Sequence, residues 1–518
     1  MTQPSGSQGN EGIVVVGNGM AGSRFVTEMR ERDPRVPLTV FGAEPQQPYN
    51  RVLLSNVLAG AARPDQIGLV DPAWYAAHDV DARLGVEVTR IDRRARLVYS
   101  GDGGVTPYGT LVIATGSTAF VPPIPGTGDG LPAGALVFRT LDDCRRILEA
   151  AGTTGRAVVV GGGLLGIEAA RGLAGRGLAV TVVHLAGHLM ERQLDPGAGR
   201  VLARTLARLG VHTRLEAQVS ALRTEPVPQG DDVGGARTPS QGQAARSGAD
   251  GGPGARVTGV ELATGEFLPG DLVILACGVR PDVALAREAG LAVDRGIVVD
   301  EMLRSVTDPS VRAIGECSQY GGTVYGLVAP AWEQAAVLAD LLAGTDEAAR
   351  FTGARQITRL KAASVELAAM GETQHGDEDP EVEVVQFADP ARGTYKKVVI
   401  KDDRLIGAIL LGETGTAGML TQLYDRAAPL PSDRLSLLFP GVNGAAVSDS
   451  PVRMPDAATV CHCNNVSKGQ IRACWEQGAR TAEEVAARTR ASTGCGSCRD
   501  AVEGIVCWLD EQEAAPAG

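Results

Sequence analysis

Apolar residues along the first two thirds of the chain occur in short continuous runs, and two of these runs lead directly into glycine-rich turns. The first run lies in GIVVVGNGMAGSRFVTEMRER and the second in GRAVVVGGGLLGIEAARGLAGRG. Each segment predicts a buried strand, a glycine turn and a helix, because short apolar runs bounded by glycines are typical of parallel strands. The first glycines of the two turns, Gly17 and Gly161, lie 144 residues apart. We therefore predict an internal repeat of one βαβ unit.

Other segments complete this pattern. Strands are predicted in LTVFGAE, YGTLVIATGS, GDLVILACGVRPD and SVRAIGECSQY, and a helix with one apolar face in VAPAWEQAAVLADLLAG. Residues 225–255 are rich in Pro, Gly, Ser and Gln and hold almost no large apolar residue. We predict that they form a disordered surface insertion between two strands.

The pattern changes after residue 345. TYKKVVIKDDRLIGAILLGE predicts two strands joined by an Asp-Asp turn, within a separate small α+β unit. Further on, Ser467 with Gln470 and Thr481 with Glu484 predict the capping boxes of two short helices, and a third helix is expected after Cys498. The predicted fold class is α/β, with two Rossmann-like dinucleotide-binding domains, a small α+β domain and a small helical cysteine domain. The predicted domains are 12–120 with 281–345, 121–280, 351–430 and 457–512.

Composition and charge narrow the function classes. The 518 residues exceed one compact domain, and a net charge of −12 argues against nucleic acid and against an anionic membrane surface as partners. The polar start MTQPSGSQGNEG lacks the features of a signal peptide, and no segment offers about 18 uninterrupted apolar residues. We therefore expect a cytoplasmic protein with no membrane span.

The first turn has the spacing of a dinucleotide site. Gly17, Gly19 and Gly22 spell G-x-G-x-x-G directly after a strand. The first glycine permits the tight turn, the second a close approach of backbone to pyrophosphate, and the third the packing of helix on strand. Glu44 lies 22 residues past Gly22, where an acid can hydrogen-bond a ribose hydroxyl. A merely structural turn is the weaker alternative, because strand, helix and acid are all in place.

The second turn repeats the glycines at Gly161, Gly163 and Gly166, but the expected acid is missing. His184 stands near the end of the following strand, where a neutral imidazole can donate to a ribose hydroxyl; an ordinary exposed loop histidine is an equal alternative. No arginine cluster stands there to hold a 2′-phosphate, which favours NADH over NADPH, although Arg192 is near enough to reach back. Two nucleotide sites in one chain predict hydride transfer between two cofactors, NAD(P)H and FAD.

Four of the nine cysteines form two close pairs, Cys461 with Cys463 and Cys495 with Cys498, separated by 31 residues. Without a secretion signal, such pairs favour a metal centre over disulfides. Their spacing suits a [2Fe-2S] cluster and also structural zinc. A flavin in the same chain favours the cluster, because zinc cannot take up electrons. The segment RVLLSNVLAG holds no cysteine, which excludes a dithiol there. The five scattered cysteines are expected to be apolar fillers: Cys144, Cys277, Cys317, Cys474 and Cys507.

From residue 12 to about 345 the chain resembles the two-dinucleotide-binding-domain flavoproteins. The resembling segments are VVVGNGMAG, YNRVLLS, LVIATGS, VVVGGGLLGIEAA, ACGVRPD and AIGEC. The resemblance implies that the first turn holds FAD and the second the nicotinamide nucleotide. It implies that Arg51 and Ser55 lie beside the flavin, that Glu168 points toward the nicotinamide as the catalytic residue, and that Glu316, where the family usually has Asp, contacts the ribityl chain. The cofactor-binding residues expected on these grounds are Gly17, Gly19, Met20, Ala21, Gly22, Glu44, Arg51, Ser55, Thr115, Gly116, Gly161, Gly163, Leu164, Leu165, Gly166, His184, Gly278, Gly315 and Glu316.

A narrower resemblance covers nearly the whole chain. VFGAEPQQPYNRVLLS and LMERQLD are similar to the flavin half of NADH-dependent nitrite reductase large subunits, and equally to electron-transfer subunits of assimilatory nitrate reductases. The cysteine module resembles the bacterioferritin-associated ferredoxin type, which implies a [2Fe-2S] cluster on the four paired cysteines. The chain ends at Gly518 without the cysteine cluster of a sirohaem domain, so we expect it to pass electrons to another protein.

The predicted function is electron transfer from NADH (or NADPH) through FAD and a [2Fe-2S] cluster to a partner. Hydride is expected to pass to flavin N5, and the electrons then to leave singly through the cluster. The resemblance implies a molybdenum-containing assimilatory nitrate reductase as the partner. A ferredoxin, a rubredoxin or a nitrite reductase is an alternative. Another alternative is a flavoprotein with a zinc-stabilised docking tail and a small acceptor such as oxygen or quinone.

Overall fold

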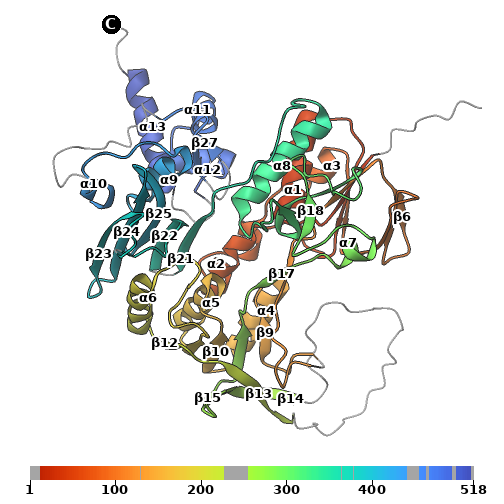
Figure 1. The fold of residues 1–518 in the computed structure, drawn as a ribbon. Coiled ribbons are helices and arrows are strands. Elements are labelled where there is room, and N and C mark those ends of the chain that lie inside the picture. Colours follow the sequence, from red (N-terminus) through yellow and green to blue (C-terminus); the bar gives the residue numbers. More distant parts are fainter. Residues whose placement is uncertain are drawn as a thin grey trace, which may run out of the picture.

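The architecture confirms the predicted fold class (Figure 1). The structure is a computed structural model, which describes residues 12–128, 130–226, 255–362, 365–376, 378–439, 454–461, 466–492 and 498–514. Two parallel five-stranded sheets with helices form the nucleotide-binding part, and a third five-stranded sheet is antiparallel. Within the described residues, no helix is long and apolar enough to cross a membrane.

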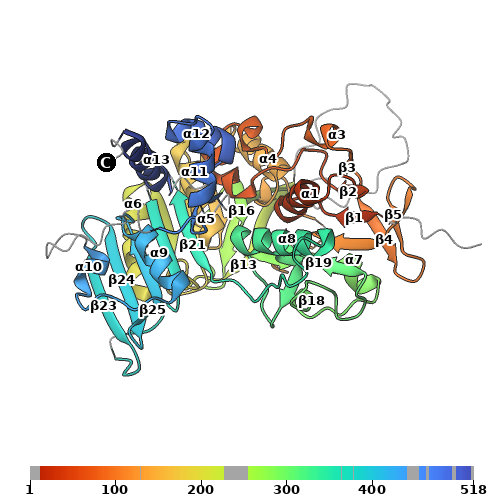
Figure 2. The ribbon, with the colours of Figure 1, turned by 90° about the horizontal axis from the view of Figure 1, so that it is seen from above.

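The first sheet takes strands from both ends of the nucleotide-binding part, in the order β19-β7-β1-β2-β3, all parallel. Except for the edge strand β3, its strands are largely buried because helices cover them, as the continuous apolar runs predict. Helices α1 (Met20–Arg32) and α8 (Val328–Ala343) lie side by side against it (Figures 1 and 2). The strands are β1 Ile13–Val16, β2 Leu38–Gly42, β3 Val80–Leu84, β7 Thr110–Ile113 and β19 Val311–Ala313.

The second sheet repeats this plan in the order β12-β11-β10-β16-β9, again parallel. Its strands are β9 Ala135–Val137, β10 Arg156–Val160, β11 Ala179–Val183, β12 Val211–Arg214 and β16 Leu272–Leu275, and its helices are α4 Leu141–Ala151, α5 Leu164–Gly175 and α6 Pro196–Arg208. A smaller antiparallel sheet is formed by β13 Val219–Pro226, β14 Ala255–Leu262 and β15 Phe267–Pro269. The predicted insertion at 225–255 thus falls between two strands, and residues 227–254 lie outside the described residues.

Two short strands join the nucleotide-binding units. β8 (Ser117–Ala119) pairs antiparallel with β17 (Val279–Pro281). β8 directly follows Gly116 and β17 directly follows Gly278, at corresponding points of the two repeats.

The small α+β unit has the predicted hairpin. β24 (Thr394–Lys401) and β25 (Arg404–Leu411) pair antiparallel, and both turn residues, Asp402 and Asp403, have positive φ of 50° and 61°. Two positive φ angles give the right twist to a two-residue hairpin loop, and Asp tolerates them. The remaining elements are β21 Ile357–Ala362, β22 Val365–Gly371, β23 Glu383–Asp389, α9 Ala417–Arg426 and α10 Leu435–Leu438.

The cysteine module is a hairpin followed by three helices. β26 (Thr459–Cys461) pairs with β27 (Val466–Ser467), and α11 Lys468–Glu476, α12 Ala482–Thr489 and α13 Arg499–Ala514 follow. Both predicted capping boxes are present, so they are confirmed together with the helix after Cys498.

Among the scattered cysteines, one expectation is wrong. Cys144, Cys317 and Cys474 are buried and Cys277 is partly buried, which fits apolar fillers, but Cys507 is exposed. Cys507 lies on α13, and the helical period turns it away from the module core, to which Val506 and Ile505 contribute.

The shorter elements complete the nucleotide-binding part. They are η1 Arg51–Leu53, α2 Leu54–Ala59, η2 Pro64–Ile67, α3 Trp74–Ala77, β4 Val88–Asp92, β5 Leu97–Ser100, β6 Val105–Pro107, α7 Ala284–Glu288, β18 Ile297–Val299, η3 Gly315–Cys317 and β20 Ser318–Tyr320.

Candidate functional site: two dinucleotide turns and a cysteine module

The two glycine turns share one backbone geometry. Gly17 and Gly161 have φ of 109° and 115°, in the region that glycine reaches without strain. A Cβ on either would lie 2.2 Å from a carbonyl oxygen, of Ala114 in the first turn and Ala276 in the second. A glycine is therefore required at both positions for the helix, the turn and the neighbouring strand to pack together.

The middle glycines face open space. A Cβ on Gly19 or on Gly163 would meet no atom within 4 Å. Helices α1 and α5 begin at the next residues, Met20 and Leu164, so their unpaired N–H groups point toward this space. An open backbone at a helix N-terminus suits a pyrophosphate, and both predicted dinucleotide sites fit their ligands in this respect.

Glu44 lies within a small polar cluster beside the first turn. It accepts hydrogen bonds from the Tyr49 hydroxyl (2.7 Å) and from Arg51, and the Arg51 guanidinium also donates to the Arg139 carbonyl (3.2 Å). Burial raises the pKa of Tyr49, so its hydroxyl keeps its proton. The structure thus brings together Glu44 and Arg51, both expected at the FAD site.

The acidic turn at Glu316 closes the same region. Its carboxylate accepts from the Ser117 hydroxyl (2.6 Å) and from Arg139. Gly315 has a positive φ of 77°, and its N–H donates to Gln334 Oε1 (2.7 Å). Sequence reasoning missed Ser117, Arg139 and Gln334, which carry no motif of their own.

Two buried amide nitrogens, Asn18 Nδ2 and Gln334 Nε2, have no hydrogen-bond partner in the described part of the chain. Asn18 is the second residue of the first turn, and Gln334 holds Gly315. Buried donors of this kind require an acceptor. They fit a polar ligand such as FAD at this edge of the sheet.

Thr115 has a structural partner. Its hydroxyl donates to the Asp282 carbonyl (2.7 Å), and Asp282 N–H donates to the Gly116 carbonyl (2.9 Å). These bonds connect the strand end at Ala114 to the segment after β17. Thr115 therefore fixes the crossover between the two units, and its contact with FAD stays a prediction.

His184 is buried, at 8% exposure, so the alternative of an ordinary exposed loop histidine is wrong. Its Nδ1 accepts from the Gly162 N–H (3.1 Å), and its Nε2 lies 3.0 Å from a carboxylate oxygen of Glu191. Both ring nitrogens are thus taken by protein partners. Gly162 lies directly before Gly163, the N-cap residue of α5. The hydrogen bond from Gly162 therefore connects His184 to the start of that helix.

Glu168 lies where α5 packs against α2. The two helices are in close contact, and Glu168 lies near Ser55 on α2, whose hydroxyl donates to the Val52 carbonyl (3.3 Å). Burial raises the pKa of Glu168 to about 8, and the nearby Ser55 hydroxyl opposes this shift. Its carboxyl therefore holds a proton at neutral pH. The structure brings Glu168 and Ser55 together, and their contacts with the nicotinamide and the flavin stay predictions.

Two of the four paired cysteines lie within the described residues. Cys461 and Cys498 are buried, at 2% and 7% exposure, in one hydrophobic cluster of the module. Cys463 and Cys495 lie outside the described residues. Two buried thiols, one from each end of the module, are the donor chemistry that an iron–sulfur cluster uses.

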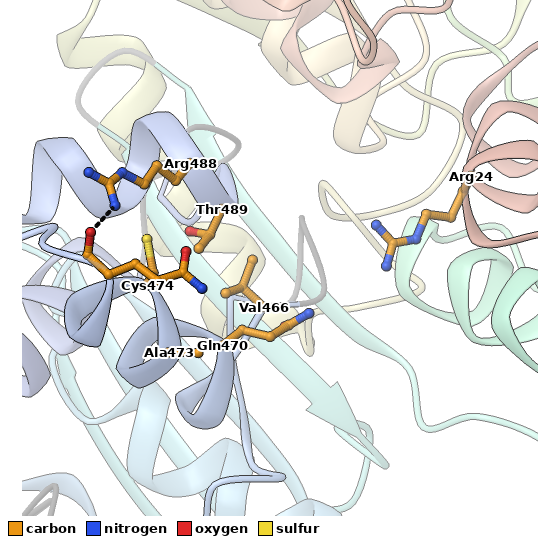
Figure 3. A pocket seen from close by; sticks show the side chains of 8 residues that line it. Arg24, Val466, Gln470, Ala473, Cys474, Arg488 and Thr489 are labelled. Atoms are coloured by element: carbon orange, nitrogen blue, oxygen red, sulfur yellow. Dashed lines mark hydrogen bonds between the residues drawn. The ribbon is translucent and has the colours of Figure 1, made fainter. Parts of the chain in front are cut away.

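The cysteine module is joined to the first nucleotide-binding unit by Arg490. Its guanidinium donates to the carbonyls of Leu69 (2.6 Å) and Gly68. Beside this joint a cleft of about 320 Å³ separates Arg24 on α1 from the module (Figure 3). On the module side the cleft is lined by Val466, Gln470, Ala473, Cys474, Gln477, Arg488 and Thr489.

Comparison with known families identifies the class. Residues 11–335 match the family described as pyridine nucleotide-disulphide oxidoreductase, which is more than half of the chain. The chain belongs to this family. Residues 357–426 match a rubredoxin NAD+ reductase C-terminal domain, and residues 459–507 match a BFD-like [2Fe-2S] binding domain. The chain therefore combines an FAD- and NAD-binding oxidoreductase domain with a [2Fe-2S]-binding domain, as the sequence motifs predict.

Individual relatives agree with the narrower resemblance. The chain is 36% identical over 501 residues to a nitrite reductase [NAD(P)H] of Bacillus subtilis (strain 168), covering 96% of this chain and 58% of that protein. It is 33% identical to the assimilatory nitrate reductase electron transfer subunit of the same organism, covering 97% of this chain and 60% of that protein. The chain thus spans less than two thirds of either relative. Among solved structures, the putidaredoxin reductase–putidaredoxin complex superposes with a TM-score of 0.68 at 25% identity, over 81% of this chain and 94% of that chain.

Proposed function

We propose that this chain is the NAD(P)H-oxidising electron-transfer component of a nitrate or nitrite reductase system, working through FAD and a [2Fe-2S] cluster. The observation that carries the proposal is the joint between the cysteine module and the first nucleotide-binding unit. Arg490 lies five residues before Cys495 and binds the carbonyls of Gly68 and Leu69.

This joint leads directly to the expected flavin site. Gly68 forms an antiparallel bridge with Tyr49, and the Leu69 N–H donates to the Pro48 carbonyl (2.7 Å). Arg51 and Ser55 follow in the same segment. The cysteine module is thus held against the stretch of chain expected beside the flavin, and such fixed placement of two redox groups is what a protein contributes to electron transfer.

The residues at the site bind, orient and hold protons. When bound, FAD accepts a hydride from the nicotinamide nucleotide, and the cluster carries electrons singly. Glu168 holds a proton at neutral pH and so offers an O–H donor in place of a negative charge.

The partner is proposed from the relatives. One of them is named as an electron transfer subunit of an assimilatory nitrate reductase, which supports a nitrate-reducing catalytic subunit as the acceptor. That this subunit contains molybdenum is part of the proposal, and it rests on the sequence resemblance alone. Another is named as a nitrite reductase, which supports a nitrite-reducing partner as the second candidate. A reconstitution that mixes the reduced chain with each purified partner and follows nitrate or nitrite loss decides between them.

The first test is the composition of the anaerobically purified protein. We expect two irons and two acid-labile sulfides per FAD, and visible cluster bands that NADH bleaches. Zinc in place of iron, in protein never exposed to oxygen or chelator, would show that the module is a docking element and would overturn the relay.

The second test separates the flavin from the cluster. In R490A, NADH should reduce the flavin at the normal rate, while bleaching of the cluster slows by about tenfold or more, because small displacements strongly slow positioned reactions. R488A is the matched control, since Arg488 binds the Gln477 carbonyl (2.9 Å) within the module. Equal cluster bleaching in R490A and unaltered protein would contradict the proposed route.

A further inference from the structure

The second dinucleotide site lacks an acid at the position that Glu44 has in the first. In the first unit the Gly17 N–H donates to the Phe41 carbonyl, and in the second the Gly161 N–H donates to the Val183 carbonyl, each at 2.8 Å. Glu44 lies three residues past Phe41, and the residue three past Val183 is Ala186. The ribose-binding acid of the nicotinamide site must therefore come from elsewhere, or be absent.

The loop after β11 brings a carboxylate back to the turn. The Met190 N–H donates to the Gly162 carbonyl (3.0 Å), and Met190 is fully buried with a positive φ of 54°. This left-handed residue reverses the chain, so that the next residue, Glu191, faces the strand end. The loop and the glycine turn thus hold each other through both backbone groups of Gly162, since its N–H donates to His184.

His184 fixes the direction of the Glu191 carboxylate. Because Nδ1 accepts from Gly162, the neutral ring carries its proton on Nε2, which donates to Glu191 Oε2 at 3.0 Å. The other oxygen, Oε1, has no hydrogen-bond partner in the described part of the chain, and the Glu191 side chain is 37% exposed. One oxygen is therefore anchored and the other is open to a ligand.

The small α+β unit supports the same loop from outside. Gln374 Nε2 donates to the carbonyls of Leu194 (3.0 Å) and Glu191 (3.3 Å). Arg192, the one arginine expected to reach a 2′-phosphate, lines a hollow with Glu372, Glu378 and Asp379 of that unit. Its charge thus faces acidic side chains.

We propose that Glu191, positioned by His184, is the acid that binds the adenosine ribose hydroxyls of the nicotinamide nucleotide and selects NADH over NADPH. An anchored carboxylate accepts a hydrogen bond from a 2′-hydroxyl and repels a 2′-phosphate. This inference rests on the proposed use of NAD(P)H by the chain. It gives His184 a positioning role in place of direct contact with the ribose.

The test compares E191Q with E216Q in the full FAD-loaded protein. Glu216 is an exposed acid next to the same loop, with its carboxylate 3.5 Å from the Cβ position of Gly187, so it matches Glu191 in charge and neighbourhood. Calorimetric titration gives the Kd values of NAD+ and NADP+, which undergo no reaction with the oxidised protein. We expect E191Q to raise the Kd of NAD+ by about tenfold, which is the loss expected for one hydrogen bond to a charged group. The Kd of NADP+ should stay unchanged or fall. E216Q should change neither by more than about twofold, a change within the range of weak surface charge effects.

The inference is overturned if E191Q leaves the ratio of the two Kd values unchanged, if E216Q shifts it instead, or if the unaltered protein prefers NADP+. Failure of the proposed function has a different signature. In that case neither NADH nor NADPH bleaches the flavin of the unaltered protein, whatever the Kd values are.

Discussion

Gly17 and Gly161 open turns whose close contacts are nearly identical, yet the side chains around the two turns have little in common. A Cβ on Gly22 would lie 1.9 Å from the Gly17 carbonyl oxygen, and a Cβ on Gly166 would lie 2.0 Å from that of Gly161. The strand ends that face the turns correspond as well, Ala114 in the first and Ala276 in the second. The repeated part is thus the backbone that receives a pyrophosphate.

One of the differences between the helices after the turns lies two residues past the last glycine. In α1 this residue is Arg24, which pairs with Glu28 and lies over the Trp332 ring at 5.4 Å from its centre. In α5 it is Glu168, buried against Ser55. At this position the first helix therefore carries a permanently charged guanidinium, and the second carries a protonated carboxyl.

The acids beside the turns differ in origin. Glu44 is held by Tyr49 and Arg51, which follow it in the same segment. Glu191 is held by His184, which precedes it, and its loop by Gln374 of another unit. We therefore expect the same backbone turn to accept two different nucleotides, and the choice between them to depend on side chains supplied after the second strand of each unit.

The largest effect is expected from the packed glycines. G22A should yield protein without FAD, and G166A should keep FAD but lose NADH-dependent flavin reduction, because each Cβ would overlap a backbone oxygen. Such overpacking costs about 1–3 kcal/mol or more and displaces the helix N-terminus. Flavin content and the rate of flavin bleaching measure the two outcomes.

The matched controls are G19A and G163A, where the Cβ meets no protein atom within 4 Å. These variants should unfold at the normal temperature and weaken only the cofactor of their own turn. Normal NADH-dependent bleaching in G166A, or loss of FAD from G166A and G22A alike, would break the correspondence of the two turns.

A smaller effect is expected at Glu44. E44Q should weaken the binding of FAD by about tenfold, because one hydrogen bond to a charged group is lost. The Kd of NAD+ should stay the same, because Glu44 belongs to the first turn. Flavin fluorescence during dilution gives the FAD affinity, and calorimetry gives that of NAD+. An equal loss of both would mean that the two sites are not separable in the way the comparison requires.

Much of this organisation follows from the sequence alone. The glycine spacing predicted both turns because the close contacts at Gly22 and Gly166 admit no other residue. The capping boxes at Ser467 and Thr481 and the Asp-Asp hairpin are local, so a few neighbouring residues determine them.

What the sequence does not predict depends on contacts between distant segments. Gln334 reaches Gly315 from helix α8, 19 residues further along the chain, and Arg490 reaches Leu69 across 421 residues. The pairing of His184 with Glu191 needs the left-handed turn at Met190, for which a methionine gives no signal. The sequence does hold one signal. LMERQLD contains an acid, and it follows a strand whose end lacks the expected acid.

The smallest expected effect concerns the proton on Glu168. A glutamate in an unfolded chain has a pKa near about 4.3, and burial raises that of Glu168 to about 8. Between these values the folded protein holds a proton that the unfolded chain has released, so rising pH favours unfolding. The free energy of unfolding should therefore fall as the pH rises from about 4.3 to 8 and become independent of Glu168 above that.

E168Q tests this because the amide does not titrate. In urea unfolding followed from pH 5 to 9, E168Q should lose part of the downward slope below pH 8, by at most about 1.4 kcal/mol per pH unit, which is the slope of one proton. R24Q is the control from the corresponding position of α1, since arginine stays charged over this range. The contrary result is that the free energy of unfolding has the same pH slope in E168Q and the unaltered protein, while the slope of R24Q differs. In that case the titrating proton is not on Glu168, and the two helices do not differ in the way that Arg24 and Glu168 indicate.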